Sequence, residues 1–95
     1  MNVSKLTDVE LNRAMVELEF GNEDKDIERL YRAGKLDHLT DWNLTMPLAV
    51  ENELKIDFHT KEVSVIGHYP YSKNKNPLRA ICEVLVLIAL EKKNG

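Results

Sequence analysis

The hydrophobic pattern is densest in the last third of the chain, where residues 77–90 predict one long helix. Asn76 is placed to cap it, and Pro77 suits the first helical position because its missing N–H would be unpaired there. At about 100° per residue, one side of this helix gathers the apolar residues Leu78, Ile81, Leu85, Ile88 and Ala89. We expect this side to face the core, with Cys82 buried and unreactive at its flank.

A second stripe lies away from that cluster on the same helix, at positions i, i+4, i+7 and i+11: Arg79, Glu83, Val86 and Leu90. Another layer of the same chain could cover it, or its two apolar residues could be tolerated on the surface. The alternative is a face for a partner or for a second copy of the chain, rimmed by Arg79 and Glu83. These four residues form the candidate interaction site, and Tyr69 and Tyr71 are further candidates.

Helical signals also mark the first half of the chain. Thr7 and Glu10 have the spacing of a capping box, which predicts a helix from Asp8 to Phe20. The apolar stripe of this helix is Leu11, Ala14, Met15 and Leu18. Residues 23–39 begin polar and then carry apolar residues at helical spacing, so we expect a short helix there.

A further helix start is predicted at residues 40–42, which read Thr-Asp-Trp. One apolar face of this helix is supplied by Trp42, Met46, Ala49 and Val50. We expect Trp42 to be a core anchor, whereas an exposed Trp42 would be a candidate hot spot for binding. Leu44 and Leu48 fall on the other side, which indicates burial on both sides. Pro47 should kink the helix or confine its regular part to one side, because proline lacks a backbone donor and crowds the preceding turn.

Alternating apolar and polar residues over 54–58, and again over 63–65, predict an antiparallel hairpin. With a two-residue turn at Thr60 and Lys61, one apolar face carries the pairs Phe58–Val63, Ile56–Val65 and Leu54–Gly67. Residues 69–75 are expected to form the main loop. Because a hairpin alone is only marginally stable, helices must cover its apolar face. The sequence therefore predicts an α+β fold, with a small antiparallel sheet packed between helices.

Composition is typical of a folded, soluble protein. The 95 residues are enough for one domain, 43% of them are apolar, and the formal net charge is −3. The N-terminus has no signal-peptide pattern, and the longest apolar run, residues 84–90, is far shorter than the roughly 20 residues that span a bilayer. Cys82 is the only cysteine, which excludes an intrachain disulfide and suits a reducing compartment. We expect a cytoplasmic protein without membrane contact.

The order of these segments carries a family resemblance. The chain has a capped N-terminal helix, Thr-Asp-Trp at 40–42, Met-Pro-Leu-Ala-Val-Glu at 46–51, a hairpin, and Asn-Pro-Leu-Arg-Ala-Ile at 76–81. In this order it resembles small phage and prophage proteins, namely the NinX-like phage proteins and the related phage ABA-sandwich domains. The resemblance spans about residues 6–90. It implies a layered helix-sheet-helix fold and a phage or prophage origin, and it implies no reaction.

Known catalytic and metal-binding patterns are missing from the sequence. The soft metal ligands lack zinc-finger or zincin spacing, and we expect the histidines among them to lie on the surface: His38, His59, His68 and Cys82. There is no nucleophile elbow, glycine-rich phosphate loop or paired-carboxylate motif. The sequence therefore predicts no catalytic residue, no metal and no cofactor.

One segment favours nucleic acid as a partner. Aromatic rings and positive charge gather over residues 69–79, in Tyr69, Tyr71, Lys73, Lys75 and Arg79. The negative net charge argues against this function, because phosphate binding usually needs a broad basic face. We therefore expect a non-enzymatic phage or prophage protein in the bacterial host cytoplasm. It would bind a host or phage protein, or a second copy of itself as a homodimer, and modulate a host defence or regulatory system. Binding of nucleic acid or nucleotide by residues 69–79 is the alternative.

Overall fold

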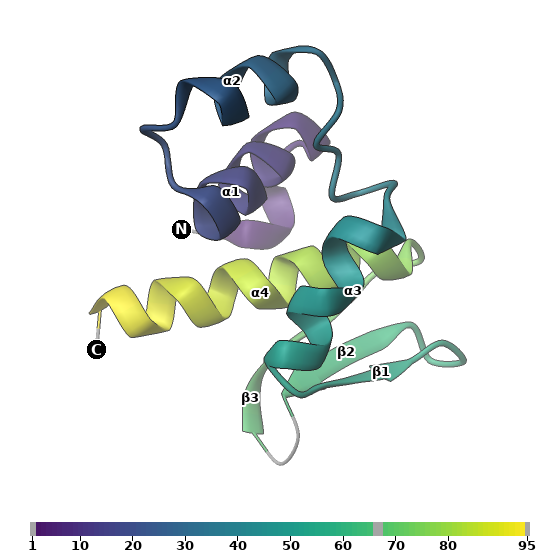
Figure 1. Cartoon of the computed structure of the whole chain (residues 1–95). Coiled ribbons are helices and arrows are strands. Elements are labelled where there is room, and N and C mark those ends of the chain that lie inside the picture. Colours follow the sequence, from purple (N-terminus) through teal and green to yellow (C-terminus); the bar gives the residue numbers. More distant parts are fainter. Residues whose placement is uncertain (1, 66–67, 95) are drawn as a thin grey trace.

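The computed structural model describes the backbone of residues 2–65 and 68–94, and the side chains of residues 2–65 and 71–92 (Figure 1). In chain order its elements are the 3-10 helix η1 (Val3–Lys5), α1 (Asp8–Phe20), α2 (Lys25–Arg32), α3 (Trp42–Glu51), β1 (Leu54–Asp57), β2 (Glu62–Val65), β3 (His68–Lys73) and α4 (Pro77–Asn94). The strands form one antiparallel sheet in the order β1-β2-β3. The predicted α+β class is confirmed, because the helices and a small antiparallel sheet pack together.

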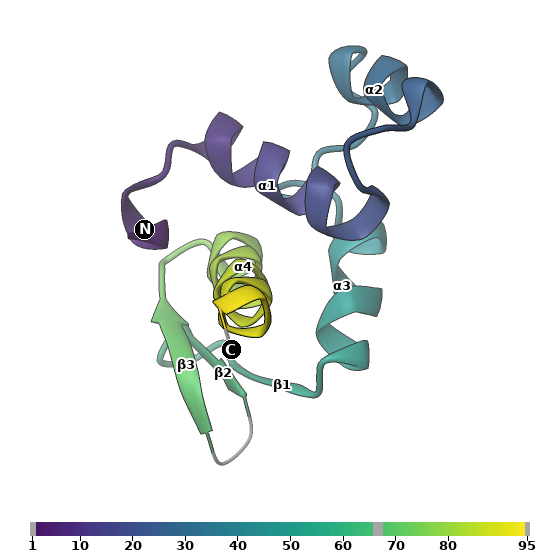
Figure 2. The same cartoon turned by 90° about the vertical axis from the view of Figure 1, so that its left-hand side faces the viewer.

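Helix α4 is the centre of the structure. Figure 2 shows it end-on, with α1, α3 and the sheet arranged around it. Its buried residues therefore run round the helix instead of along one side, and include Ala80, Ile81, Cys82, Val84, Leu85 and Val86. The predicted cap is confirmed, because the Asn76 side chain accepts hydrogen bonds from the N–H groups of Leu78 (3.1 Å) and Arg79 (3.4 Å). The surplus of apolar residues on this helix follows from its central position.

Helix α1 begins and ends where the sequence predicts. Oγ1 of Thr7 accepts a hydrogen bond from the N–H of Glu10 (3.1 Å), and Oε1 of Glu10 accepts one from the N–H of Thr7 (2.8 Å). Gly21 follows the last turn with φ of 78°, a conformation that glycine adopts at little cost. Leu11 and Met15 of the predicted stripe are buried against α4.

Helix α2 is the short helix expected within residues 23–39, and it lies on the outside of α1 (Figures 1 and 2). None of its residues is buried. Arg13 of α1 holds it in place: Nη1 donates to Oε2 of Glu28 (2.6 Å), and the guanidinium lies 4.8 Å from the centre of the Tyr31 ring. Polar contacts therefore attach this helix to the rest of the chain.

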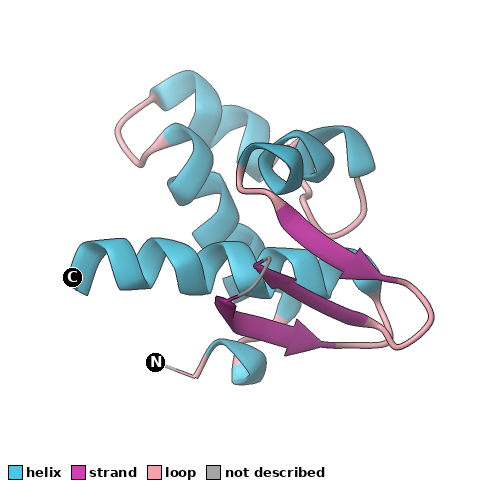
Figure 3. Cartoon of the chain, turned by 90° about the horizontal axis from the view of Figure 1, so that it is seen from below, coloured by secondary structure: helices cyan, strands magenta, loops and turns pink. Residues whose placement is uncertain are grey.

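The sheet covers α4 with one face, and Figure 3 shows its strands side by side. The observed pairs Leu54–Val65 and Ile56–Val63 differ by two residues from the predicted register, so these four apolar residues still pack on the core. Phe58, predicted on the same face, lies outside the strand and is exposed. The predicted two-residue turn is wrong because Asp57 organises a longer one. Its side chain accepts from the N–H groups of His59 (2.9 Å) and Thr60 (3.1 Å), and Lys61 closes the turn with φ of 64°.

Residues 69–75, expected to be a loop, instead contribute most of strand β3, so that prediction is wrong. β3 pairs with β2 through Val63–Ser72 and Ser64–Tyr71, and the register shifts between Ser64 and Val65. Pro70 is compatible with this strand because β3 lies at the edge of the sheet, where a missing donor can face away from the ladder.

Candidate protein-interaction surface

Helix α3 buries two small residues, packs Met46 and Leu48 partly against the core, and leaves two large apolar residues exposed. Thr45 and Ala49 are buried, whereas Trp42 is 40% exposed and Val50 is 71% exposed. The predictions that Trp42 is a core anchor and that Val50 lies on an inward face are therefore wrong. Helix α3 is apolar on most of its circumference, so periodicity alone cannot select the buried side.

One contact fixes the buried side of this helix, and another fixes its start. Oγ1 of Thr45 donates a hydrogen bond to the carbonyl oxygen of His38 at 2.6 Å, inside the core. The Asp41 side chain caps the helix by accepting from the N–H of Asn43 (2.9 Å). The helix continues on both sides of Pro47, so of the two predicted effects of this proline, confinement of the regular part to one side is wrong. Trp42, Met46 and Val50 follow one another at spacings of four residues and form what we call the outward ridge, with exposed ends and a partly buried Met46 in the middle.

Phe58 extends this apolar surface from the neighbouring hairpin. The centre of its ring lies 6.2 Å from that of Trp42, at an interplanar angle of 47°. Phe58 is 61% exposed because the longer turn places it in the loop between β1 and β2, instead of in the predicted pair with Val63. Two aromatic side chains from separate elements therefore meet at the surface.

A shallow groove of about 570 Å³ follows the outward ridge, lined by Trp42, Asn43, Met46, Pro47, Val50 and Glu51. We call these six residues, together with Phe58, the α3 surface. Its lining is mostly apolar, and Glu51 is its only ionisable group. An exposed, contiguous group of aromatic and aliphatic side chains with a polar edge is typical of a surface that binds another macromolecule.

The stripe on α4 predicted as an interaction site is covered by the chain's own elements, so it is not an exposed face. Val86 and Glu83 are buried. The guanidinium of Arg79 donates to Oε2 of Glu83 (2.8 Å), to Oδ1 of Asp8 (2.5 Å) and to the carbonyl oxygen of Leu6 (2.6 Å). The alternative in which another layer of the same chain covers this stripe agrees with the structure.

The other predicted site residues are dispersed. Leu90 is partly buried and packs against the core. Tyr71, Lys73 and Lys75 are exposed at and beyond the end of β3, whereas the Tyr69 side chain lies outside the described residues. Arg79 is engaged by Glu83 and Asp8, so the structure does not combine it with the two lysines into one basic face.

His38, expected at the surface, is fully buried at the centre of a polar network, so that expectation is wrong for this residue. Its Nε2 lies 2.7 Å from Oε1 of Glu19, and its backbone N–H donates to Oδ1 of Asn12 (2.9 Å). Nδ2 of Asn12 in turn donates to the carbonyl oxygen of Leu36 (3.0 Å). These bonds join α1 to the segment that leads into α3, and thereby help to position the α3 surface.

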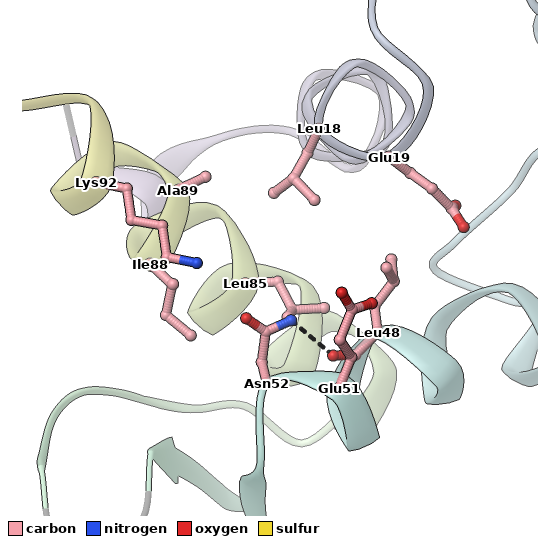
Figure 4. Close-up of a pocket in the computed structure, with 9 residues that line it drawn as sticks. All are labelled: Leu18, Glu19, Leu48, Glu51, Asn52, Leu85, Ile88, Ala89 and Lys92. Carbon is pink, nitrogen blue, oxygen red and sulfur yellow. Dashed lines mark hydrogen bonds between the residues drawn. The ribbon is translucent and has the colours of Figure 1, made fainter.

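A second groove, of about 450 Å³, lies between the C-terminal ends of α1 and α3 and the side of α4 (Figure 4). It is lined by Leu18, Glu19, Leu48, Glu51, Asn52, Leu85, Ile88, Ala89 and Lys92. Nδ2 of Asn52 donates to the carbonyl oxygen of Leu48 (2.8 Å). The ionisable groups of the lining are two carboxylates and one ammonium. Glu51 lies at the edge of both grooves.

The one cysteine has the properties of a structural thiol. Cys82 is buried, as predicted, and burial raises the pKa of its thiol to about 12. A thiol in this state is not an activated nucleophile. Among the side chains that the structure describes, no three histidine, cysteine or acidic residues are grouped so that they could hold a metal ion.

Comparison of the chain with models of protein families, with curated proteins and with solved structures found no match. Within the described residues, no helix combines the length and the apolar character that a membrane crossing requires.

Proposed function

We propose that this chain is a non-enzymatic protein that acts by binding another protein through the α3 surface. The observation that carries the proposal is the exposed pair of Trp42 and Phe58, next to an uncovered Val50. Tryptophan is enriched among residues that dominate binding energy, because its large rigid ring buries much area at a small entropic cost. A helix and a turn that the core already holds in place would not need to be ordered on binding.

The proposal extends to the setting of this interaction. The resemblance of residues 40–51 and 76–81 to NinX-like and ABA-sandwich phage proteins supports a phage or prophage origin. The protein would then act in the bacterial cytoplasm on a host or phage protein, and interference with a host defence or regulatory system is the role that we propose there. That role rests on analogy, whereas the binding surface rests on exposed side chains.

A second candidate function is the binding of single-stranded nucleic acid. The exposed Tyr71, Lys73 and Lys75 favour it, because an aromatic ring beside positive charge can stack on a base and contact phosphate. The engagement of Arg79 with Glu83 and Asp8 weighs against it. A mobility shift with single-stranded DNA that vanishes in the Lys73→Glu/Lys75→Glu variant would favour this function over the first.

Crosslinking in cells tests the proposed function. A photoreactive amino acid at position 50 would report on the α3 surface, and the same residue at position 9 is a matched control. Val50 and Val9 are both exposed valines on helices, at 71% and 72%, and Val9 lines a different shallow groove on α1.

We expect one discrete adduct from position 50 in bacteria that carry the gene, and loss of that adduct when Trp42 is replaced by serine. Equal labelling from positions 50 and 9, or an adduct that persists in the Trp42→Ser variant, would contradict the proposal. Circular dichroism would establish that each variant remains folded.

A further inference from the structure

We propose that the occupant of the α3 surface is a basic amphipathic helix, with lysine or arginine beside its apolar face. This inference rests on the proposed function and specifies the chemistry of the partner. It is carried by the distribution of charge around α3, together with the length of the apolar ridge.

The segment that contains α3 carries charge of one sign only. Residues 36–54 include four acidic residues and no lysine or arginine, namely Asp37, Asp41, Glu51 and Glu53. The side chains of Asp37 and Asp41 accept hydrogen bonds from nearby backbone N–H groups. Glu51 and Glu53 are exposed, and among the described side chains neither forms an ion pair. These two carboxylates are therefore available to a cationic partner.

The position of Glu51 adds to this preference. It is the last residue of α3, where the negative end of the helix dipole also favours a cation. It borders the second groove as well, whose other carboxylate, Glu19, is held by His38. Lys92 also lines that groove, and Lys55 is exposed on β1, so both soften the local negative charge. On the α3 surface itself, Glu51 has no basic neighbour within the lining.

The apolar ridge has the dimensions of a helix-binding site. Trp42, Met46 and Val50 span about 12 Å, since eight residues rise about 1.5 Å each. That length accommodates about two turns of a partner helix with apolar residues at i, i+3 or i+4, and i+7. A basic residue following the last of these would lie near Glu51 at the end of the ridge.

A second copy of the chain fits this surface less well. A symmetric dimer places the same patch of each copy against the other, so Glu51 would meet a lining that contains no cation. The net charge of −3 also makes two copies repel each other. The α3 surface therefore complements a basic partner better than it complements itself.

Trp42 is the only tryptophan in the chain, so its fluorescence reports on this surface without a label. The experiment titrates the full chain with two synthetic helical peptides of about four turns that contain no aromatic residue. Both peptides carry leucine at the same helical positions. One has lysine and arginine at its polar positions, and the other has glutamate.

We expect the basic peptide to shift the Trp42 emission to shorter wavelength in a saturable way, and to bind at least about tenfold more tightly than the acidic peptide. The Glu51→Gln substitution should weaken binding of the basic peptide, and so should raising the salt concentration from about 0.1 M to about 0.5 M. The control Glu23→Gln changes charge equally at an exposed site before α2 and should have no effect. Val50→Ser should weaken binding, whereas Val9→Ser should not.

Each contrary result would overturn a different part of the proposal. Equal binding of the two peptides, with dependence on Val50, would overturn the charge inference and leave the α3 surface as a docking site. An emission change that is the same in the Val50→Ser variant, or no change with either peptide, would overturn the assignment of a helical partner to this surface. A wild-type dimer in light scattering that dissociates on Val50→Ser would show that the occupant is a second copy.

Discussion

Arg79 attaches the start of the chain to the central helix, and we predict that Arg79→Met destabilises the fold strongly. Its guanidinium contacts Glu83, Asp8 and the carbonyl oxygen of Leu6 at 2.5–2.8 Å. The side chain of Glu83 is only 4% exposed, so the substitution leaves a buried carboxylate without its cation. Removing one partner of a buried ion pair typically costs about 3–5 kcal/mol. Ser72 continues to donate to Oε1 of Glu83, which places the expected loss near about 3 kcal/mol.

Urea unfolding followed by circular dichroism measures this loss. For a chain of this size, about 3 kcal/mol corresponds to a fall in Tm of roughly 12–24 °C. The double variant Arg79→Met/Glu83→Met should recover part of the stability, because it removes both charges together but takes the acceptor away from the buried Ser72 hydroxyl. Arg29→Met is the matched control, since its partner Asp26 is exposed and the expected change is below about 0.5 kcal/mol. A loss below about 1 kcal/mol for Arg79→Met, or no recovery in the double variant, would refute the reasoning.

Three further results are expected. Lys61→Gly should raise the free energy of unfolding by about 0.5–1 kcal/mol, because the residue has φ of 64°; a decrease in urea unfolding would contradict this. Cys82 should react with a thiol reagent at pH 8 only after unfolding, since burial raises its pKa to about 12; rapid reaction of the native chain would exclude a closed core. Hydrogen bonds from the backbone N–H groups of Thr7 and Thr60 lower the pKa values of Glu10 and Asp57 below their ordinary values of 4.5 and 3.8. The stability that these two carboxylates contribute is therefore complete above their ordinary pKa values, and it is lost as the pH falls through their lower pKa values in the folded state. Acid titration of Tm should therefore be flatter in Glu10→Gln than in the wild type.

Local signals made the helix ends predictable. The reciprocal bonds of Thr7 and Glu10, and the cap at Asn76, involve residues within three positions of one another, so the sequence contains all that determines them. The face of the sheet was predictable for a similar reason, because alternation survives a register error of two residues. The turn length was missed although its signal is equally local, because an aspartate that accepts from the N–H groups two and three residues ahead favours a turn at Asp57.

The candidate site depended on tertiary packing that a single sequence does not define. The second stripe on α4 was predicted as an interface, but η1, α1 and the sheet surround this helix. Helix α3 offered apolar residues on opposite sides, and the small Thr45 and Ala49 became the inward pair. Trp42, Met46 and Val50 lie only about 80° from this pair around the helix, so periodicity gave no signal that separated the outward ridge from the buried side.

The central claim is that α3 presents Trp42 to solvent, and acrylamide quenching of the native chain tests it most directly. Because Trp42 is the only tryptophan and is 40% exposed, we expect a quenching constant at least about a third of that in the urea-unfolded chain. A native quenching constant about tenfold below the unfolded value would mean that Trp42 is enclosed. In that case the α3 surface would be part of the core, and the proposed function would lose its main support.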